Sequence, residues 1–357
     1  MRHRAEEPAR FAPALIHWQR QHGRHGLPWQ GTRDPYRVWL SEIMLQQTQV
    51  ATVLGYYDRF LQRFPDVGAL AAAQPDEVMA LWSGLGYYSR ARNLHRCAQV
   101  VVAQHGGAFP GTAEALAQLP GIGDSTAAAI AAFCFGERIS IVDGNVRRVL
   151  GRLLAFEEDL STAAAQRTLW QRAQALLPAQ PSHEDMVSYT QGLMDLGAGL
   201  CTRTRPACDR CPVADLCLAH RQGAQDRFPV KTRRLVRRHE SWWLLVLRVP
   251  AAAGSRIWLE RRPAQGIWAG LHCVPVFAEE AAALAAAGPA GAKAQALPAI
   301  AHALTHKELR LHPLVVEAVS DAVLPGRGEG VWVAPEALAS LGLPAPVRSL
   351  LAQLAGG

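Results

Sequence analysis

The sequence predicts a multidomain protein in which an all-α region precedes an α+β region. Up to about residue 225, apolar residues recur at three- and four-residue spacing, as they do in helices that bury one face. A polar, basic stretch without periodicity follows at 226–240 and is typical of a linker. Beyond it, short β-rich runs indicate strands. We therefore expect a helical region at 1–225 and an α+β domain at 241–357.

Composition narrows the class of protein. With 357 residues, of which 49% are hydrophobic and 19% charged, the chain is long enough for two globular domains with a sizeable core. Its first residues lack the apolar stretch of a secretion signal, and no apolar run reaches membrane-spanning length. We expect a cytoplasmic protein without membrane association. A net charge of +7 permits a polyanionic partner but does not require one.

Several helices and strands are marked by local signals. Asp34 and Pro35 form an N-cap and first-turn pair, and Thr112 marks another helix start after a Pro-Gly pair. The expected buried faces are Tyr36, Trp39, Leu40, Ile43 and Met44 in one helix, and Val146, Val149, Leu150 and Leu153 in another. The expected strands are 241–249, 257–260, 311–319 and 331–333. The Ala-rich stretch at 278–301 is expected to form a surface helix and a loop.

Four cysteines form the strongest single signal in the chain. Cys201, Cys208, Cys211 and Cys217 lie within seventeen residues in a C-x6-C-x2-C-x5-C pattern, which indicates a cage for a metal or a cluster. Zinc ribbons usually present two C-x2-C pairs, whereas this loop has one, so the spacing favours an iron–sulfur cluster over zinc. Two disulfides are a third interpretation, which requires an oxidising compartment.

A glycine-containing turn, LPGIG at 119–123, lies between two expected helices. Gly121 and Gly123 let the backbone turn tightly and expose amide groups at the start of the next helix, where they can bind a phosphate. The alternative is an ordinary helix–helix turn. With the Ala-rich helix that follows, the segment matches a helix-hairpin-helix at about 112–135, a motif that holds the DNA backbone without reading bases.

These motifs together resemble a known family. The LPGIG turn, the VDGNV segment about twenty residues later and the four cysteines resemble the endonuclease III superfamily of base-excision DNA glycosylases. Within it, LPW at 27–29, SEIMLQQTQV at 41–50 and GLGYY at 84–88 are similar to the MutY-type adenine DNA glycosylases. The resemblance implies a helix-hairpin-helix glycosylase fold with a [4Fe-4S] cluster loop at 201–217. It also implies a monomeric, DNA-associated enzyme whose partner is double-stranded DNA.

Two acidic residues are the candidates for catalysis. Cleaving a base from deoxyribose resembles glycoside hydrolysis, so it needs two carboxyl groups in unlike environments. Glu42 lies among apolar residues, where desolvation keeps it protonated as a general acid, whereas Asp143 precedes a helix N-terminus that favours its ionised form beside the sugar. The alternatives are a solvent-facing Glu42 and an Asp143 that only caps its helix. The resemblance places both acids at the family's catalytic positions and Asn145 at a supporting one.

A base inside a duplex must be flipped out before it can react, so wedge residues are expected. Gln46 lies one helical turn after Glu42 on the same face, and Tyr87 offers a flat ring for intercalation. The resemblance implies that both fill the vacated stack, although a half-buried core aromatic is the alternative for Tyr87. Trp29, in the matching LPW segment, belongs to the same expected DNA-binding set.

Ser125 distinguishes two subtypes of the family. Relatives that also cut the DNA backbone carry a lysine there, whose amine attacks the sugar. A serine cannot form that imine, and the guanidinium of Arg147 is permanently charged and equally unsuited. We therefore expect base removal without an efficient strand-cutting step.

The second domain resembles the Nudix-like lesion-recognition domain of adenine glycosylases, through WLERRP at 258–263 and GIWAGL at 266–271. The acidic metal-binding helix of Nudix hydrolases is missing after Gly266, so diphosphate hydrolysis is not expected. The family's Phe-Ser-His loop is Leu-Thr-His here, so Thr305 and His306 are expected to recognise 8-oxoguanine without the aromatic ring. A polar pair at a strand end is the alternative.

The resemblance implies removal of adenine mispaired with 8-oxoguanine or guanine. Arg203, Arg205 and Arg210 in the cysteine loop are expected to contact phosphate, or else to form a solvated face. Three other functions compete with this interpretation: a glycosylase-lyase acting on damaged pyrimidines, a non-catalytic mismatch-binding protein, and a nucleotide-pool pyrophosphohydrolase.

Overall fold

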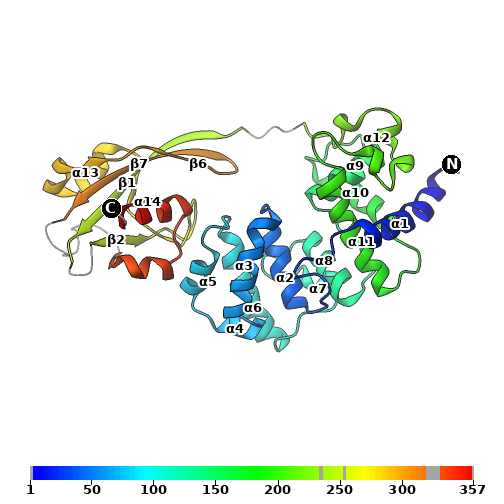
Figure 1. Ribbon diagram of the computed structural model, residues 1–357, viewed down its shortest axis with the longest axis horizontal. Helices are drawn as coiled ribbons and strands as arrows, with labels where there is room; N and C mark the ends of the chain where they lie inside the picture. The colour runs from blue at the N-terminus through cyan, green and yellow to red at the C-terminus, as the bar shows by residue number, and fades with distance from the viewer. Residues whose placement is uncertain (1–2, 233–235, 252–254, 319–329, 356–357) are drawn as a thin grey trace. The chain divides into compact units, whose positions relative to one another are not determined.

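The computed structural model describes residues 3–232, 236–251, 255–318 and 330–355 (Figure 1). Arg233 and Arg234 of the expected linker lie outside these residues. The chain forms two compact units, of which the first comprises Met1–Tyr57, Asp66–Gly68 and Arg96–Arg234, and the second Asp58–Pro65, Ala69–His95 and Leu235–Gly357. The helical segment at 69–95 thus belongs to the same unit as the strands, which the sequence did not indicate.

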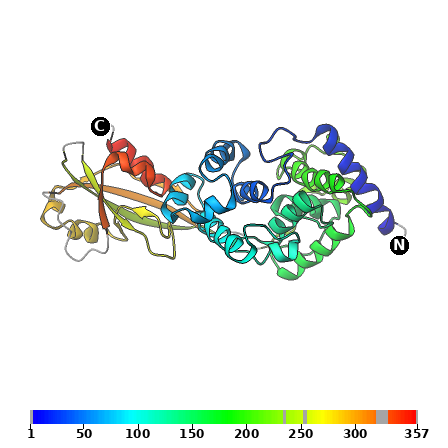
Figure 2. The same cartoon turned by 90° about the horizontal axis from the view of Figure 1, so that it is seen from below.

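The first unit is helical in the part of the chain that is described. Its helices are α1 (His3–His22), α2 (Pro35–Leu45), α7 (Ala113–Leu116), α8 (Asp124–Phe135), α9 (Gly144–Leu153), α10 (Ala163–Ala175), α11 (His183–Asp195) and α12 (Leu218–Arg221). Helices α3 (Val50–Arg63), α4 (Val67–Ala72) and α6 (Ser89–His105) have residues in both units, and α5 (Pro75–Trp82) lies in the second. Helix α1 packs along α11 (Figure 2). Over the described ranges, no helix has the length and apolarity needed to cross a bilayer.

Helix α2 begins where the sequence predicts, because Asp34 caps it. The backbone N–H of Tyr36 donates to Asp34 Oδ1 at 2.9 Å, and Pro35 occupies the first turn. The five residues of the predicted stripe are at most 4% exposed: Tyr36, Trp39, Leu40, Ile43 and Met44. This stripe anchors α2 on the core and leaves another edge of the helix, with Ser41, Glu42 and Leu45, to line a cavity.

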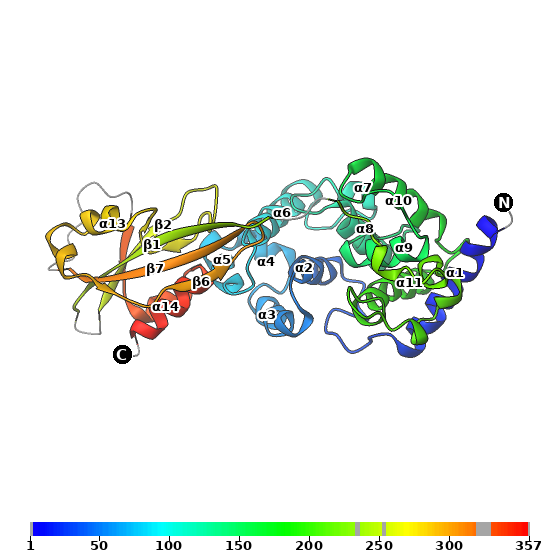
Figure 3. The same cartoon turned by 90° about the horizontal axis from the view of Figure 1, so that it is seen from above.

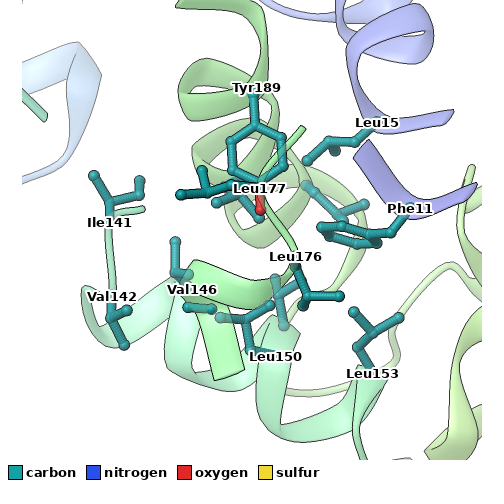
Figure 4. Close-up of a cluster of buried hydrophobic side chains, with 14 of the residues drawn as sticks. Phe11, Leu15, Ile141, Val142, Val146, Leu150, Leu153, Leu176, Leu177 and Tyr189 are labelled. Atoms are coloured by element: carbon teal, nitrogen blue, oxygen red, sulfur yellow. The ribbon is translucent and has the colours of Figure 1, made fainter. Parts of the chain in front are cut away.

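Helix α9 is anchored by the face that the sequence predicts. Val146, Val149, Leu150 and Leu153 are at most 4% exposed and belong to one cluster of buried side chains. Figure 4 shows Val146, Leu150 and Leu153 in the same cluster as Phe11 of α1 and other labelled core residues. Core packing therefore fixes the helix that begins just after Asp143.

The predicted hairpin is present between α7 and α8. Thr112 caps α7 by accepting from the backbone N–H of Ala115 at 3.3 Å. Gly121 has a φ of +78°, a left-handed conformation that glycine adopts without the clash of a Cβ. Gly123 is the N-cap of α8, and Ile122 between the glycines is 5% exposed. The glycine backbone is thus at the surface while the isoleucine holds the turn in place.

Beyond α11 the chain forms short turns that carry the four cysteines. Helix α11 continues as a π-helical turn, η1 (Leu196–Leu200), and Cys201 is the C-cap of this turn. Two 3-10 turns follow, η2 (Cys208–Arg210) and η3 (Ala214–Leu216), and their C-caps are Cys211 and Cys217. A further turn, η4 (Gln225–Arg227), follows α12.

The second unit contains a sheet, which confirms the predicted α+β class. The strands described are β1 (Arg238–Val249), β2 (Arg256–Arg261), β3 (His272–Cys273), β4 (Val276–Phe277), β5 (Gln295–Ala296), β6 (Ile300–Ala303), β7 (Lys307–Glu317) and β8 (Gly330–Val333). The strand order is β3-β2-β1-β7-β5, with β4 paired to β1, β6 to β7 and β8 to β2. The long strands β1 and β7 run parallel, from Arg238↔Lys307 to Arg248↔Glu317 (Figures 1 and 3). Strand β1 therefore begins inside the segment that the sequence assigns to the linker.

The Ala-rich stretch is more ordered than the sequence predicts. Its helix is present as α13 (Glu280–Ala286), but Ala283 and Ala287 are buried at 0% and 7% exposure and pack in a cluster with sheet residues. A turn, η5 (Gly288–Lys293), leads to β5 and β6, which pair with β7. The predicted loop is wrong here. The residues of β5 and β6 carry no strand signal of their own, and pairing of their backbone with β7 decides their conformation. The unit ends with η6 (Pro335–Ser340) and α14 (Ala345–Ala355).

Candidate active site

A cavity of about 1050 Å³ lies within the first unit. Its walls come from the end of α1, the loop at 23–33, α2, the first turn of α8, the start of α9, α11 and the loop after Cys201. It brings together seven residues that the sequence singles out: Trp29, Glu42, Gln46, Ser125, Asp143, Asn145 and Arg203. A cavity of this size accommodates a nucleotide.

Glu42 lies on the cavity edge of α2 in a poorly solvated position. Although its side chain reaches the cavity, burial and, to a smaller extent, the charge of Asp143 together raise the pKa of Glu42 from 4.5 to about 8. The carboxyl group is therefore predominantly protonated at neutral pH. Asp143 lines the same cavity, so the two carboxyl groups face a shared space.

Asp143 caps α9 while it lines the same cavity. Its Oδ1 accepts the backbone N–H of Val146 at 2.7 Å, which is the ordinary role of an aspartate at an N-cap. One residue earlier, the backbone N–H of Val142 donates to Ser125 Oγ at 3.1 Å. Ser125 thus ties the segment that carries Asp143 to the first turn of α8. The capping and functional interpretations of Asp143 are compatible, because one oxygen makes the capping bond.

Asn145 is exposed on the first turn of α9 and is fixed by two neighbours. Arg148 Nη2 donates to Asn145 Oδ1 at 3.0 Å and to the carbonyl of Gly197 at 2.6 Å. Arg148 Nε also donates to the carbonyl of Cys201 at 2.7 Å. A Cβ at position 197 would lie 2.9 Å from the Cβ of Asn145, so only glycine allows this approach of η1. The start of α9 is therefore tied to the π-helical turn that precedes the cysteine loop.

Trp29 forms a wall of the cavity. It is 8% exposed, and its ring meets that of Tyr57 edge to face at a centroid distance of 5.2 Å. Its loop is braced from within, since the backbone N–H of Leu27 donates to Gln30 Oε1 at 3.0 Å and Gln30 Nε2 donates to the carbonyl of Arg24 at 2.9 Å. These bonds hold the aromatic wall in place without using the indole itself.

The same loop is attached to α11 by a partly buried ion pair. Arg24 donates from its backbone N–H and from Nε to the two carboxylate oxygens of Asp195, at 2.9 and 2.6 Å. Gln191 Nε2 also donates to this carboxylate at 2.8 Å, and Asp195 is 5% exposed. The pair therefore fixes the distance between two walls of the cavity.

Gln46 lines the cavity at a position slightly different from the one expected. Helix α2 ends at Leu45, and Gln46 is its C-cap with an extended ψ of 111°, so the residue does not lie on a continuous helical face with Glu42. Its Nε2 donates to Thr126 Oγ1 of α8 at 3.3 Å. The amide is thus held at the junction of α2 and α8.

Other predicted residues lie outside the cavity. Gly121 and Gly123 do not line it and remain at the surface of the hairpin. In the second unit, the hydroxyl of Tyr87 is 3.0 Å from Thr305 Oγ1. Tyr87 is 43% exposed, so it is not a core aromatic. His306 is exposed in the turn between β6 and β7, and its carbonyl accepts the backbone N–H of Arg238 at 3.1 Å.

The cysteine loop is attached to α9 through Arg152. This arginine is 3% exposed and donates from Nη1 to Cys201 Sγ at 3.4 Å and to the carbonyl of Thr202 at 2.7 Å. The thiol of Cys217 lies 3.4 Å from the carbonyl of Arg152. Donors at sulfur atoms are a regular feature of iron–sulfur sites, where they stabilise the thiolate charge.

The four thiols also influence one another. All four are free and partly buried. Burial raises the pKa of Cys211 to about 12, and the charges of the other three thiols act in the same direction. Gln225 Nε2 is 3.7 Å from Cys208 Sγ, a second donor at a sulfur. The donor set therefore fits an iron–sulfur cluster. Within the described ranges, no three His, Cys, Asp or Glu side chains are arranged to hold a single metal ion.

Comparison with protein families matches three segments of the chain. Residues 40–175 match the HhH-GPD superfamily of base excision DNA repair proteins, and residues 246–353 match the NUDIX domain. Residues 201–217 match the iron-sulfur binding domain of endonuclease III, a segment that begins at Cys201 and ends at Cys217.

Curated relatives extend this match over almost the whole chain. An adenine DNA glycosylase of Buchnera aphidicola subsp. Baizongia pistaciae (strain Bp) is 31% identical over 348 residues, which cover 96% of both chains. This chain belongs to the adenine DNA glycosylase family. The adenine DNA glycosylase of Homo sapiens is 39% identical over 320 residues, covering 75% of this chain and 58% of the human one. A solved structure, a thermostable thymine-DNA glycosylase, aligns with a TM-score of 0.54 at 27% identity, covering 61% of this chain and 98% of the other.

Membership of the adenine DNA glycosylase family confirms several predictions made from the sequence. These are the fold class, the base-excision glycosylase class, DNA as the partner, and an iron–sulfur cluster in preference to zinc or disulfides. The family is one of hydrolases that act on N-glycosyl bonds.

Some residues of the site were missed by the sequence analysis. Arg148 and Arg152 lie one helical turn apart on α9, so the sequence could have predicted that both project from the same face of this helix. Asp195 was also readable, as an acid within the otherwise apolar run that ends α11. The close approach of Gly197 to Asn145 was not readable, because it joins residues far apart in the chain.

Gly197→Ala is expected to slow base release, because its Cβ would displace Asn145, which lines the cavity. We expect a single-turnover rate on a mispaired duplex at least about tenfold lower than wild type. Gly199→Ala is the matched control, since it lies in the same turn and its Cβ would meet nothing within 4 Å. Equal rates for the two variants would contradict this role of the close approach.

Proposed function

We propose that this adenine DNA glycosylase removes adenine mispaired with 8-oxoguanine or guanine from double-stranded DNA. It hydrolyses the N-glycosidic bond as a monomer and without an efficient strand-cutting step. The observation that carries the proposal is a carboxyl group with a pKa of about 8, Glu42, sharing a nucleotide-sized cavity with Asp143. In this proposal residues 1–225 perform catalysis and residues 241–357 recognise the lesion.

Glu42 and Asp143 divide the reaction between them. The neutral carboxyl of Glu42 donates its proton to the departing adenine, which makes the base a better leaving group. The carboxylate of Asp143 stabilises the positive charge that develops on the sugar. Asn145, held by Arg148, orients this side of the cavity, and Trp29 supplies a flat apolar wall for the flipped base.

Further residues of the two units hold the duplex. The exposed amides of Gly121 and Gly123 bind the DNA backbone through phosphate, and Ser125 lies just inside the next helix. Gln46, at the junction of α2 and α8, fills the space that the flipped nucleotide leaves. Tyr87 intercalates beside the lesion with its exposed ring.

The cluster organises the loop that follows the catalytic region. Cys201, Cys208, Cys211 and Cys217 are the proposed ligands of a [4Fe-4S] cluster, which supplies a rigid cross-link of the loop when bound. The loop presents exposed arginines to phosphate: Arg203, Arg205 and Arg210.

Recognition of the opposite base is assigned to the turn between β6 and β7. Thr305 provides a hydroxyl and His306 an exposed imidazole, both able to donate a hydrogen bond to an oxidised purine. The contact between Thr305 and Tyr87 brings this turn beside the proposed wedge.

Glu42→Gln is expected to lower the single-turnover rate by roughly 10²–10⁴-fold, because the amide cannot donate the proton. The wild-type rate should fall as the pH rises above about 8, where Glu42 becomes ionised. Glu157→Gln, at an exposed glutamate that does not line the cavity, is the matched control. Unchanged base release by Glu42→Gln would remove Glu42 from the mechanism.

The same variant tests stability. The pKa of Glu42 is 4.5 before folding and about 8 in the folded chain, so ionisation favours the unfolded state between these pH values. Stability supplied by the neutral carboxyl is complete below pH 4.5 and is lost as the pH rises toward 8. Thermal unfolding should therefore show Glu42→Gln gaining in Tm over wild type as the pH rises through this window. A constant difference in Tm would contradict the raised pKa.

Strand cutting tests the subtype. Wild-type protein incubated with an A:8-oxoG duplex should give strand breaks only after alkali. Ser125→Lys places an amine in the cavity and should form an adduct that borohydride traps, whereas Ser125→Arg, of similar length, should not. Breaks before alkali with wild-type protein, on a thymine-glycol duplex only, would instead favour a glycosylase-lyase for pyrimidines.

Thr305→Val removes the hydroxyl and keeps the shape of the side chain. We expect the preference for 8-oxoguanine over guanine opposite adenine to fall about 2- to 10-fold, as one hydrogen bond predicts. Thr305→Ser retains the hydroxyl and should retain the preference. The preference is measured as a ratio of kcat/KM on the two duplexes, and equal ratios for Thr305→Val and wild type would contradict the assignment.

A further inference from the structure

The turn that presents Tyr87 has an unusual backbone. Gly84 and Gly86 have φ values of 107° and 73°, and Tyr87 follows with a φ of 47°. A residue with a side chain rarely adopts this left-handed conformation unless its surroundings hold it there. The exposed ring of Tyr87 is therefore displayed by a constrained turn, and the contacts beneath the turn decide how it points.

Arg90 lies beneath this turn. Its side chain is almost buried, with 8% of the residue exposed, and Nη2 donates to the carbonyls of Leu85 and Gly86, each at 3.2 Å. Burial lowers the pKa of Arg90 to about 10, so the guanidinium remains charged at neutral pH. A permanent charge is thus used to hold two successive carbonyl groups of the turn.

The same guanidinium contacts the rings on either side of the turn. Its central carbon lies 5.5 Å from the ring centroid of Tyr87 and 5.2 Å from that of Trp82, distances typical of cation–π contacts. Trp82 in turn donates from Nε1 to the carbonyl of Gly86 at 3.1 Å. Arg90 therefore joins the backbone of the turn to the aromatic ring that the turn displays.

We propose that Arg90 is a positioning residue that holds the Tyr87 ring ready for intercalation, and that it promotes extrusion of the target base through Tyr87. This inference rests on the proposed role of Tyr87 as a wedge. A side chain that is already ordered loses less conformational freedom on binding, so its insertion into the duplex costs less. Arg90 does not line the cavity that holds Glu42 and Asp143, so we expect its effect to pass through the wedge.

A double-mutant cycle tests the proposal. Arg90→Met, Tyr87→Ala and the double variant are compared with wild type on a duplex that carries 2-aminopurine opposite 8-oxoguanine. Fluorescence reports extrusion of the base, and single-turnover base release is measured on the A:8-oxoG duplex. We expect Arg90→Met to reduce both readouts, the rate by about tenfold, as the loss of one charged contact predicts. The double variant should be no slower than Tyr87→Ala, because Arg90 acts through that ring.

Two further variants separate positioning from folding. Arg92→Met is the matched control, since Arg92 lies on the same helix and donates to the carbonyl of Ala269 at 2.7 Å without contacting Tyr87. It should leave extrusion at the wild-type level. Arg90→Lys keeps the charge and should restore part of the fluorescence change. If Arg90→Met unfolds, Arg90→Lys and its double variant with Tyr87→Ala complete the same cycle.

Three outcomes would overturn the inference. The effects of Arg90→Met and Tyr87→Ala could multiply in the double variant, Arg90→Met could slow base release without changing extrusion, or it could leave extrusion and the rate at their wild-type levels. Because fluorescence measures extrusion and not hydrolysis, failure of wild-type protein to release adenine would count against the proposed function alone.

Discussion

The burial of Glu42 beside the charge of Asp143 is the constraint on which the rest of the site depends. A carboxyl group stays neutral at pH 7 where burial or a nearby negative charge disfavours its ionised form, and Glu42 experiences both. The buried position of Glu42 lowers the stability of the folded chain at higher pH, since the ionised carboxylate is better solvated in the unfolded chain. In the proposed mechanism the fold accepts this cost, because the proton retained on Glu42 is the one that the leaving base needs.

The remaining contacts keep the two acids in one geometry. The core fixes α9 from one side, and Ser125 holds the segment just before Asp143. Arg148 and Gly197 bring the π-helical turn against Asn145, and Arg152 continues this connection to the cysteine loop. The cysteine loop is therefore attached to the same helix that Asp143 caps. Catalytic geometry requires such support, because small displacements of the reacting groups cost large factors in rate.

Much of this arrangement could be predicted from the sequence, wherever the pattern that indicates a feature lies within a single helix, strand or loop. The Asp34 cap, the buried stripe of α2, the cysteine spacing and the strands of the second unit are local patterns, and the structure contains them. The order within the Ala-rich stretch could not be predicted, since pairing with β7 decides it. The end of α2 at Leu45, the brace under Tyr87 and the approach of Gly197 to Asn145 arise from tertiary contacts that periodicity does not record.

The most direct test of the central claim is a titration of the Glu42 carboxyl by carbon-13 NMR, with Glu42→Gln used to assign the signal. The predicted result is a midpoint near pH 8, with the signal still that of a neutral acid at pH 7. A midpoint near the ordinary value of 4.5 would mean that Glu42 is ionised under working conditions. The division of roles between the two acids would then be wrong.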